Sequence, residues 1–302
     1  MPTENMKKFW VKAQKQLAQV PINASIEPEK TTSDVTVTNH LIVLSSFEGV
    51  KIRAWYTVPA SLPPEEGWPA VMVLPSFAGN VVNSGYLAQL GYATLTLYPR
   101  GQGESKKEWQ VEGDTGSIHY KMAKNVTNQE RFYYYAAYLD CLRGLDFLDT
   151  RAEVNTKRIA VTGSSQGGGL TLAMAAIDTR VKVAVARLPS LCNIPLGVEM
   201  KAEGYAELHD YLVDHPEDRE AAMETLWYID NLNLADAIQA HTLVSLAQVD
   251  LNHPYSTVMP VFEKIPALKS VVIYPDAAIR IHSGAINTDF NSHMVEWFTR
   301  YL

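Results

Sequence analysis

The sequence has few cysteines and no concentrated block of basic residues. Its two cysteines, Cys141 and Cys192, are too few for a disulfide framework, and neither has the spacing of a metal ligand. With a net charge of -7, the chain lacks the positive surface that nucleic acids and anionic membranes require. We therefore expect no metal, no nucleic-acid partner and no membrane partner.

The chain also lacks an apolar run long enough to span a membrane, and it shows no internal repeat. Its N-terminal segment carries Lys7, Lys8, Lys12 and Lys15 at near-helical spacing, without the apolar core of a signal peptide. These features predict a helix over about residues 4–19 and a cytoplasmic protein.

What the chain does have is a long alternation of strand and helix patterns. With 302 residues, of which 47% are hydrophobic, we expect a single domain over residues 1–302. Eight apolar, β-branched runs predict strands at Val35–Leu44, Ile52–Val58, Ala70–Leu74, Tyr92–Tyr98, Arg158–Thr162, Val181–Ala186, Thr242–Ala247 and Ser270–Tyr274. Helical patterns lie between the later runs, so the sequence predicts an α/β fold with a mostly parallel sheet covered on both faces.

Two parts depart from this alternation. The first two strands have no helix between them, which predicts an antiparallel hairpin at the sheet edge. After the sixth strand, a helical insertion over about residues 190–240 separates it from the next, and we expect the insertion to act as a lid.

The strongest chemical signal is the pentapeptide Gly163-Ser164-Ser165-Gln166-Gly167. It follows a predicted strand and precedes a helical run, which is the context of the nucleophile elbow of α/β-hydrolases. The turn forces its central residue into a strained conformation, and glycines remove side chains that would clash there. The pattern therefore predicts Ser165 as a nucleophile.

A serine nucleophile needs an imidazole base and an orienting carboxylate, which follow it in the order acid, then histidine, in this fold. Asp250 follows the strand Thr242–Ala247, and His282 follows Ser270–Tyr274. We predict Asp250 as the acid and His282 as the base.

Other residues compete for both roles. Asp276 also follows a strand, but it lies on the same loop as His282. His253 is close in sequence to Asp250, which favours a surface or cleft-lining role over catalysis. His293 lies on the apolar stripe of the terminal helix, which favours a packing role.

The oxyanion of the tetrahedral intermediate needs two N–H donors, one of them from the residue after the nucleophile. Gln166 occupies that position, and Phe77, in the turn after Ala70–Leu74, is the predicted second donor. The alternative is that this turn is a simple connection from strand to helix.

With these residues in place, the sequence resembles carbohydrate esterase family seven, the acetyl xylan esterases and cephalosporin C deacetylases of the α/β-hydrolase superfamily. Arg100-Gly101-Gln102 matches its Arg-Gly-Gln signature, the segment Gly163 to Gly168 matches its elbow in all but one position, and His282 matches the histidine of its His-Glu motif. The resemblance covers nearly the whole chain and implies the catalytic and oxyanion residues named above.

The resemblance also implies the chemistry and its context. It implies a serine esterase that hydrolyses short-chain, acetyl esters of carbohydrates or related small molecules through an acyl-enzyme, without a cofactor, as a homo-oligomer, often a hexamer. The chain departs from the family pattern at three places. Ser283 replaces the glutamate that follows the histidine, the turn at Phe77 has a different sequence, and Asn252-His253-Pro254 stands where the family commonly has Cys-Pro. These departures alter the expected pocket walls more than the chemistry.

Two other functions compete with this one. The segment Thr162 to Gly169 fits the glycine-rich turn of short-chain dehydrogenases, but it lies far from the first strand and no Tyr-x-x-x-Lys follows it. A catalytically silent α/β-hydrolase that acts as a binding protein is the second alternative, since a fold alone proves no activity.

Overall fold

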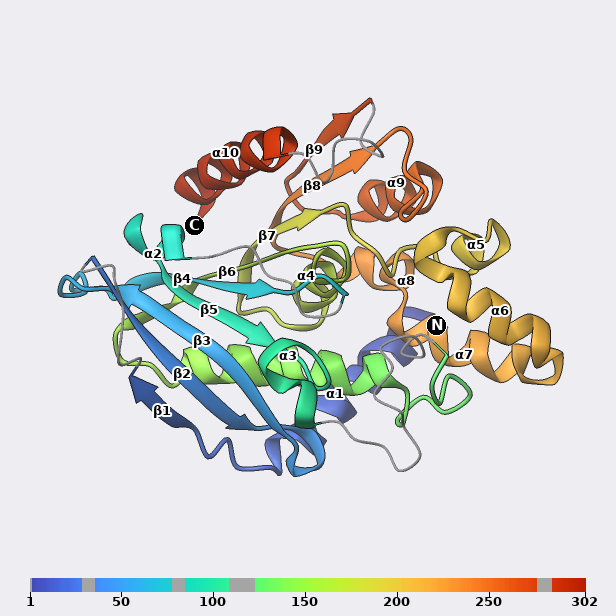
Figure 1. Cartoon of the computed structure of the whole chain (residues 1–302), viewed down its shortest axis with the longest axis horizontal. Coiled ribbons are helices and arrows are strands. Elements are labelled where there is room, and N and C mark those ends of the chain that lie inside the picture. The colour runs from blue at the N-terminus through green and yellow to red at the C-terminus, as the bar shows by residue number, and fades with distance from the viewer. Residues whose placement is uncertain (1, 29–35, 78–84, 109–122, 276–283) are drawn as a thin grey trace.

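The computed structural model describes residues 2–28, 36–77, 85–108, 123–275 and 284–302. Within this part of the chain, one sheet has the strand order β1-β2-β3-β5-β4-β6-β7-β8-β9 (Figure 1). In chain order the strands are β1 Ser25–Pro28, β2 Val37–Ser45, β3 Lys51–Pro59, β4 Trp68–Leu74, β5 Ala93–Tyr98, β6 Val154–Ser164, β7 Val181–Arg187, β8 His241–Ala247 and β9 Lys269–Tyr274.

The sheet combines an antiparallel edge with a parallel centre. Strands β1, β2, β3 and β5 pair antiparallel, as predicted for the first two expected strands, now β2 and β3. Strands β5, β4, β6, β7, β8 and β9 pair parallel. Parallel strands end at one edge of the sheet, where ligands bind in open α/β folds. The loops after β4, β6 and β8 therefore share that edge.

Helices alternate with the parallel strands. They are α1 Pro2–Ala18, α2 Gly85–Gln89, α3 Tyr133–Asp149, α4 Gln166–Ile177, α5 Ile194–Glu199, α6 Ala206–Asp214, α7 Arg219–Ile229, α8 Asn231–Leu234, α9 Tyr255–Lys264 and α10 Gly284–Tyr301. All eight predicted strands are present, and β1 is an additional short strand. The predicted insertion after the sixth expected strand corresponds to α5–α8, which extends beyond the sheet at the right of Figure 1.

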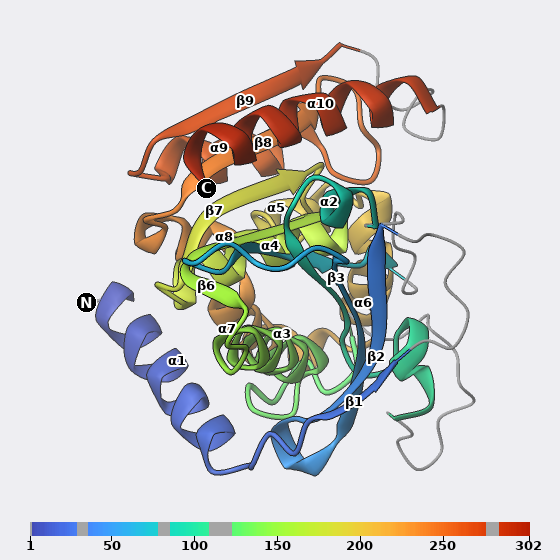
Figure 2. The same cartoon turned by 90° about the vertical axis from the view of Figure 1, so that its left-hand side faces the viewer.

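Both faces of the central sheet are buried. Alternate residues of β4 point to opposite faces: Ala70 and Met72 pack with α3 and α4, whereas Val71 and Val73 pack with α2 and α10. Figure 2 shows α3 and α10 on opposite sides of the sheet. Burial on both faces explains why these strands read as continuous apolar runs instead of an alternation.

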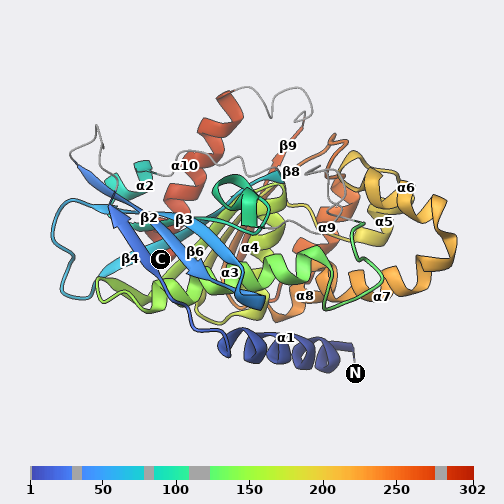
Figure 3. The same cartoon turned by 60° about the horizontal axis from the view of Figure 1, so that its bottom comes forward.

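The N-terminal helix forms an outer layer over α3 (Figure 3). Trp10 stacks on Tyr138 at 5.2 Å between ring centroids, and Met6, Ala13 and Leu17 are buried with it. Their spacing gives α1 one apolar face, and its lysines lie on the other side. None of the helices in the described ranges has both the length and the apolar character needed to cross a bilayer.

Candidate active site

Ser165 lies on the tight turn between β6 and α4. Its φ of 55° and ψ of -117° are a conformation that non-glycine residues rarely adopt. A Cβ at Gly167 would lie 2.2 Å from the carbonyl oxygen of Leu74, and one at Gly163 would lie 2.5 Å from the Gly167 carbonyl carbon. The glycines of the pentapeptide are therefore sterically required.

Backbone hydrogen bonds hold the strained residue on both sides. The Ser165 N–H donates to the Arg187 carbonyl at 2.9 Å, and its carbonyl accepts from the N–H groups of Gly169 and Ser190, both at 3.0 Å. These bonds tie the elbow to the end of β7. They fix the backbone that presents the partly exposed Ser165 side chain at the carboxyl edge of the sheet.

The imidazole that contacts this serine belongs to His253. Its Nε2 lies 3.0 Å from Ser165 Oγ, which is a normal hydrogen-bond distance. His253 lies on the loop between β8 and α9, and its side chain is 11% exposed. Residues 88 positions apart in sequence thus meet because β6 and β8 end at the same edge.

Asp250 lies behind this imidazole, and its side chain is 1% exposed. Its Oδ1 accepts from the backbone N–H groups of Asn252 at 2.8 Å and His253 at 3.0 Å, and its Oδ2 lies 3.6 Å from His253 Nδ1. Burial alone would raise the pKa of Asp250, but the hydrogen bonds and attraction from His253, with the Asn252 N–H, lower it overall. Asp250 is therefore ionised at neutral pH.

The structure brings together two of the three predicted catalytic positions. Ser165 and Asp250 flank a single imidazole, that of His253, which we expected only to line the cleft. The predicted base His282 and the alternative acid Asp276 lie outside the described residues. The Asp-x-x-His-Pro segment was the signal available in the sequence, because a turn closed by Asp250 can direct a nearby histidine back toward the nucleophile.

The packing role expected for His293 is wrong. Its side chain is 44% exposed, with Nε2 3.7 Å from the Asp289 carboxylate. The buried stripe of α10 consists of Phe290, Met294 and Phe298, and His293 is one position out of phase with it.

The two predicted oxyanion donors follow neighbouring strands. Gln166 is the first residue of α4, where a backbone N–H has no acceptor within its own helix. Phe77 follows β4, which pairs with β6 through Leu74 and Gly163, and its side chain is 36% exposed. Both residues thus come from the edge that carries Ser165, and their role as donors stays a prediction.

A buried network of amides and phenols surrounds the Gln166 side chain. Its Oε1 accepts from Gln102 Nε2 at 3.1 Å and from the Tyr134 hydroxyl at 3.2 Å, and its Nε2 donates to Gln102 Oε1 at 2.9 Å. Gln166 Nε2 also donates to the Pro75 carbonyl at 3.4 Å. Because Pro75 lies two residues before Phe77, the network connects the two loops that carry the predicted donors.

Arg100 anchors the other end of this network. Its Nε and Nη2 donate to the Asp140 carboxylate, each at 2.8 Å, and its carbonyl accepts from the Tyr133 hydroxyl at 3.0 Å. Tyr133 in turn accepts from Gln102 Nε2 at 2.7 Å. Arg100 and Gln102 are therefore both buried within the fold.

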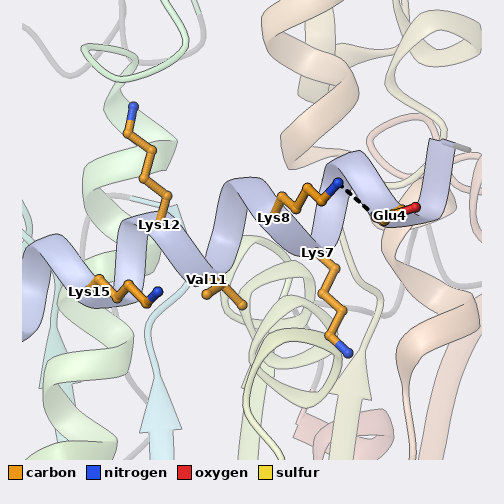
Figure 4. Close-up of a pocket in the computed structure, with 6 residues that line it drawn as sticks. All are labelled: Glu4, Lys7, Lys8, Val11, Lys12 and Lys15. Atoms are coloured by element: carbon orange, nitrogen blue, oxygen red, sulfur yellow. Dashed lines mark ion pairs between the residues drawn. The ribbon is translucent and has the colours of Figure 1, made fainter.

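A hollow lies on the outer side of α1, lined by Lys7, Lys8, Val11, Lys12, Lys15 and Glu4 (Figure 4). Lys8 pairs with Glu4 at 2.7 Å, and Lys12 pairs with Glu130. This hollow contains no nucleophile and no imidazole, so it is not the active site.

The fold and the nucleophile elbow define the protein as an α/β-hydrolase. Its sequence matches the model of the acetyl xylan esterase (AXE1) family over residues 2–300, and the chain belongs to that family. Neither the dinucleotide binder nor the silent binding protein is favoured by this membership. The glycines at positions 167 and 168 in fact face the carbonyl oxygens of Leu74 and Arg187 within the fold.

Two relatives that align with the chain are both named as esterases. The chain is 24% identical over 276 residues to the acetyl esterase Axe7A of Xylanibacter ruminicola, and 23% identical over 219 residues to a 4-O-methyl-glucuronoyl methylesterase of Cerrena unicolor. These alignments cover 88% and 70% of the chain but only 61% and 41% of the relatives. The chain thus spans less than two thirds of the length of either protein.

Solved structures share the fold over nearly the whole chain. The acetyl xylan esterase from Paenibacillus sp. R4 superposes with a TM-score of 0.89 at 30% identity, covering 99% of this chain and 95% of that one. Acetyl xylan esterase 1 from Thermoanaerobacterium sp. gives a TM-score of 0.85 at 24% identity, covering 98% and 93% of the two chains. The acylaminoacyl peptidase of Pyrococcus horikoshii shares the fold, with a TM-score of 0.67 at 15% identity, 94% of this chain and 42% of the peptidase being covered.

Proposed function

We propose that the protein is a serine esterase that hydrolyses short acyl esters, in particular acetyl esters of carbohydrates or related small molecules. The observation that carries this proposal is Ser165, held on a strained elbow with its Oγ 3.0 Å from an imidazole. Membership of the acetyl xylan esterase family supports the acetyl group as the acyl part. Cephalosporin deacetylation is a second activity that the sequence resemblance implies.

The reaction proceeds through an acyl-enzyme. Ser165 Oγ attacks the ester carbonyl while an imidazole accepts its proton, and the Asp250 carboxylate stabilises the imidazolium. The backbone N–H groups of Phe77 and Gln166 hold the oxyanion. The imidazolium then protonates the leaving alcohol, and water activated by the same base releases the acid.

The base is a histidine. The sequence resemblance assigns it to His282, which lies outside the described residues, so that assignment stays a prediction. Among the described residues, His253 is the imidazole that contacts Ser165.

A contact between the insertion α5–α8 and the catalytic loop supports a role for the insertion in substrate selection. The N–H of Glu203 donates to the Leu251 carbonyl at 2.9 Å, which joins the insertion to the loop of Asp250 and His253. We propose that the insertion acts as a lid over the site.

The family resemblance also implies a homo-oligomer, often a hexamer, and this oligomeric state stays a prediction. Size-exclusion chromatography with light scattering tests it.

The test is an ester series measured with wild-type enzyme and with Ser165→Ala. We expect p-nitrophenyl acetate and acetylated xylo-oligosaccharides to be hydrolysed, with the rate falling as the acyl chain lengthens. The proposal fails if no ester in the series is turned over, or if long acyl chains are strongly preferred. Cofactor fluorescence with NAD and NADP tests the dinucleotide alternative in the same preparation.

A further inference from the structure

Arg187 is a buried arginine that no described carboxylate neutralises. Three arginines are buried in the described ranges: Arg100, Arg143 and Arg187 are 2%, 4% and 6% exposed. Arg100 pairs with Asp140 and Arg143 with Asp146, but within the same ranges Arg187 has no such partner. Its Nε is also buried without a hydrogen-bond partner. Arg187 thus differs from the two buried arginines that hold the fold together.

A buried guanidinium of this kind is unusual because it keeps its charge. Arginine is not deprotonated in proteins, and an unpaired charge in the interior is strongly destabilising. Burial lowers the pKa of Arg187, and the described groups that raise it are the phenols of Tyr274 and Tyr86, which are neutral donors and acceptors and not counter-ions. The guanidinium therefore offers a positive charge and free N–H groups to an anion that binds beside it.

Arg187 lies at the sheet edge that carries the nucleophile. It is the last residue of β7, it pairs with Ser164 of β6, and its carbonyl accepts the Ser165 N–H at 2.9 Å. Ligands of open α/β folds bind at this edge, where the parallel strands end. The guanidinium is therefore one arginine side chain away from the backbone of the nucleophile.

The Arg187 side chain points to the face of the sheet that α2 and α10 cover. Val183 and Val185 point to that face, and alternation along β7 places Arg187 with them. Its Cζ lies 5.9 Å from the centre of the Phe290 ring of α10. Tyr86 of α2 packs on the same cluster and interacts electrostatically with Arg187, and burial raises the pKa of Tyr86 to about 12. Its hydroxyl keeps its proton, so it is a second hydrogen-bond donor near the guanidinium.

The shape of the guanidinium indicates which anion fits. Its planar fork donates two parallel hydrogen bonds to a carboxylate. The acetyl group of the proposed substrate has no further polar group, so such a carboxylate belongs to the alcohol part. A carbohydrate with a carboxylate is a sugar acid, for example a uronic acid. Because the protein has a net charge of -7, its overall field does not attract such a substrate, and a local cation has to do so.

We propose that Arg187 binds a carboxylate on the alcohol part of the substrate, so that the enzyme prefers acetyl esters of acidic carbohydrates to those of neutral ones. This inference rests on the proposed esterase function. Arg187 forms no covalent bond and moves no proton. It supplies an ion pair that holds the substrate beside Ser165.

The test compares wild type with Arg187→Met, Arg187→Lys and Arg143→Met. The substrates are two methyl glycosides acetylated at the same positions, methyl glucuronide and its neutral amide. The measured quantity is the ratio of kcat/KM for the acid to kcat/KM for the amide. Arg143→Met is the matched control, because it also removes a buried arginine, one that donates to the Leu17 and Val20 carbonyls next to α1.

We expect wild type to favour the acid by at least about tenfold and Arg187→Met to lose this preference. Arg187→Lys should keep part of it, because lysine retains the charge but not the fork. Arg143→Met should keep the wild-type ratio. Arg187→Met should also unfold at or above the wild-type temperature, since it removes a buried charge without a partner. A lower unfolding temperature with an unchanged ratio would instead mean that Arg187 only packs on Phe290, and would overturn the proposal.

Binding is also measured without turnover. At constant ionic strength, unacetylated methyl glucuronide should raise the unfolding temperature of wild type more than its amide does, and the two should act equally on Arg187→Met. Acetate, the released acid, is the second ligand. If acetate stabilises wild type through Arg187 while the esters show no preference, the residue binds the product, and the proposed substrate selection is wrong.

The outcomes separate this inference from the esterase function. If neutral esters are hydrolysed but wild type shows no preference for the acid, or both Arg187 variants keep that preference, the Arg187 inference alone fails. If methyl glucuronide binds through Arg187 but no ester is hydrolysed, the esterase function fails and the carboxylate site stands.

Discussion

The side-chain amides of Gln102 and Gln166 bond to each other in both directions, at 3.1 and 2.9 Å, in the buried interior beside the nucleophile. Gln166 follows Ser165 and is the predicted first oxyanion donor. Gln102 belongs to the Arg-Gly-Gln segment, more than sixty residues earlier in the chain. The signature segment is thus attached directly to the residue whose backbone must be placed for catalysis.

Replacing Gln102 by Ala should lower kcat by about tenfold with little change in KM, a fraction of the loss caused by removing an oxyanion donor outright. The change removes both hydrogen bonds between the two amides and weakens the network that holds the Gln166 backbone. Gln14→Ala is the control, since Gln14 donates to the Ile177 carbonyl at the end of α4 that is remote from Ser165. Equal kinetic effects of the two variants would contradict a positioning role for Gln102.

Removing one partner of the buried pair of Arg100 and Asp140 should cost far more stability than removing one partner of a surface pair. Burial alone would lower the pKa of Arg100, but Asp140 raises it overall, so the guanidinium remains charged. Asp140→Asn leaves that charge poorly compensated and should cost about 3–5 kcal/mol in the free energy of unfolding. Glu130→Gln, which removes the exposed partner of Lys12, should cost less than about 1 kcal/mol. Urea unfolding measures both variants.

Gly167→Ala should destabilise the fold through a clash with the backbone. The new Cβ would lie 2.2 Å from the Leu74 carbonyl oxygen and 2.9 Å from the Pro75 carbonyl oxygen, which are both backbone atoms. We expect a loss above about 4 kcal/mol, or no folded protein. Gly91→Ala is the contrast, because Gly91 has a φ of +95° with no atom within 4 Å of the new Cβ. That variant carries backbone strain alone, of about 1–2 kcal/mol, and similar losses for both would refute the steric argument.

Lowering the pH should reduce activity and the stabilising contribution of Asp250 in two different pH ranges. Activity should fall as the base is protonated, in the range around pH 6.5 where imidazoles titrate. The pKa of Asp250 is lowered in the folded protein, so its contribution to stability is present above its ordinary value of about 3.9 and is lost as the pH falls through the lowered value. The stability difference between wild type and Asp250→Asn should therefore shrink only below about pH 4. A difference that shrinks between about pH 5 and 7 would contradict the lowered pKa.

The fold could be predicted from the sequence because the parallel strands are buried on both faces. Each of the eight expected runs corresponds to a strand in the sheet. The exception is β1, Ser25–Pro28, whose four residues show no clear alternation and end in proline. Its pairing with β2 is a tertiary contact at the sheet edge, which periodicity does not encode.

The candidate site was predictable only where local geometry dictates the residue. The elbow requires glycine at fixed positions, so Ser165 stands out, and Asp250 is placed by the strand before it. His253 was given a lesser role because it lies three residues from Asp250, and the turn closed by Asp250 Oδ1 is what directs its ring to Ser165. The pairing of Gln102 with Gln166 joins two distant segments and leaves no periodic signal.

The central claim is that the Ser165 hydroxyl is an activated nucleophile, and its reaction with a fluorophosphonate tests this most directly. Mass spectrometry of the digested protein should find the label on the peptide that contains Ser165. Ser165→Ala should stay unlabelled and lose several orders of magnitude in kcat while unfolding at the wild-type temperature. Labelling at another residue, or a Ser165→Ala variant that keeps more than about a tenth of wild-type activity, would contradict the account.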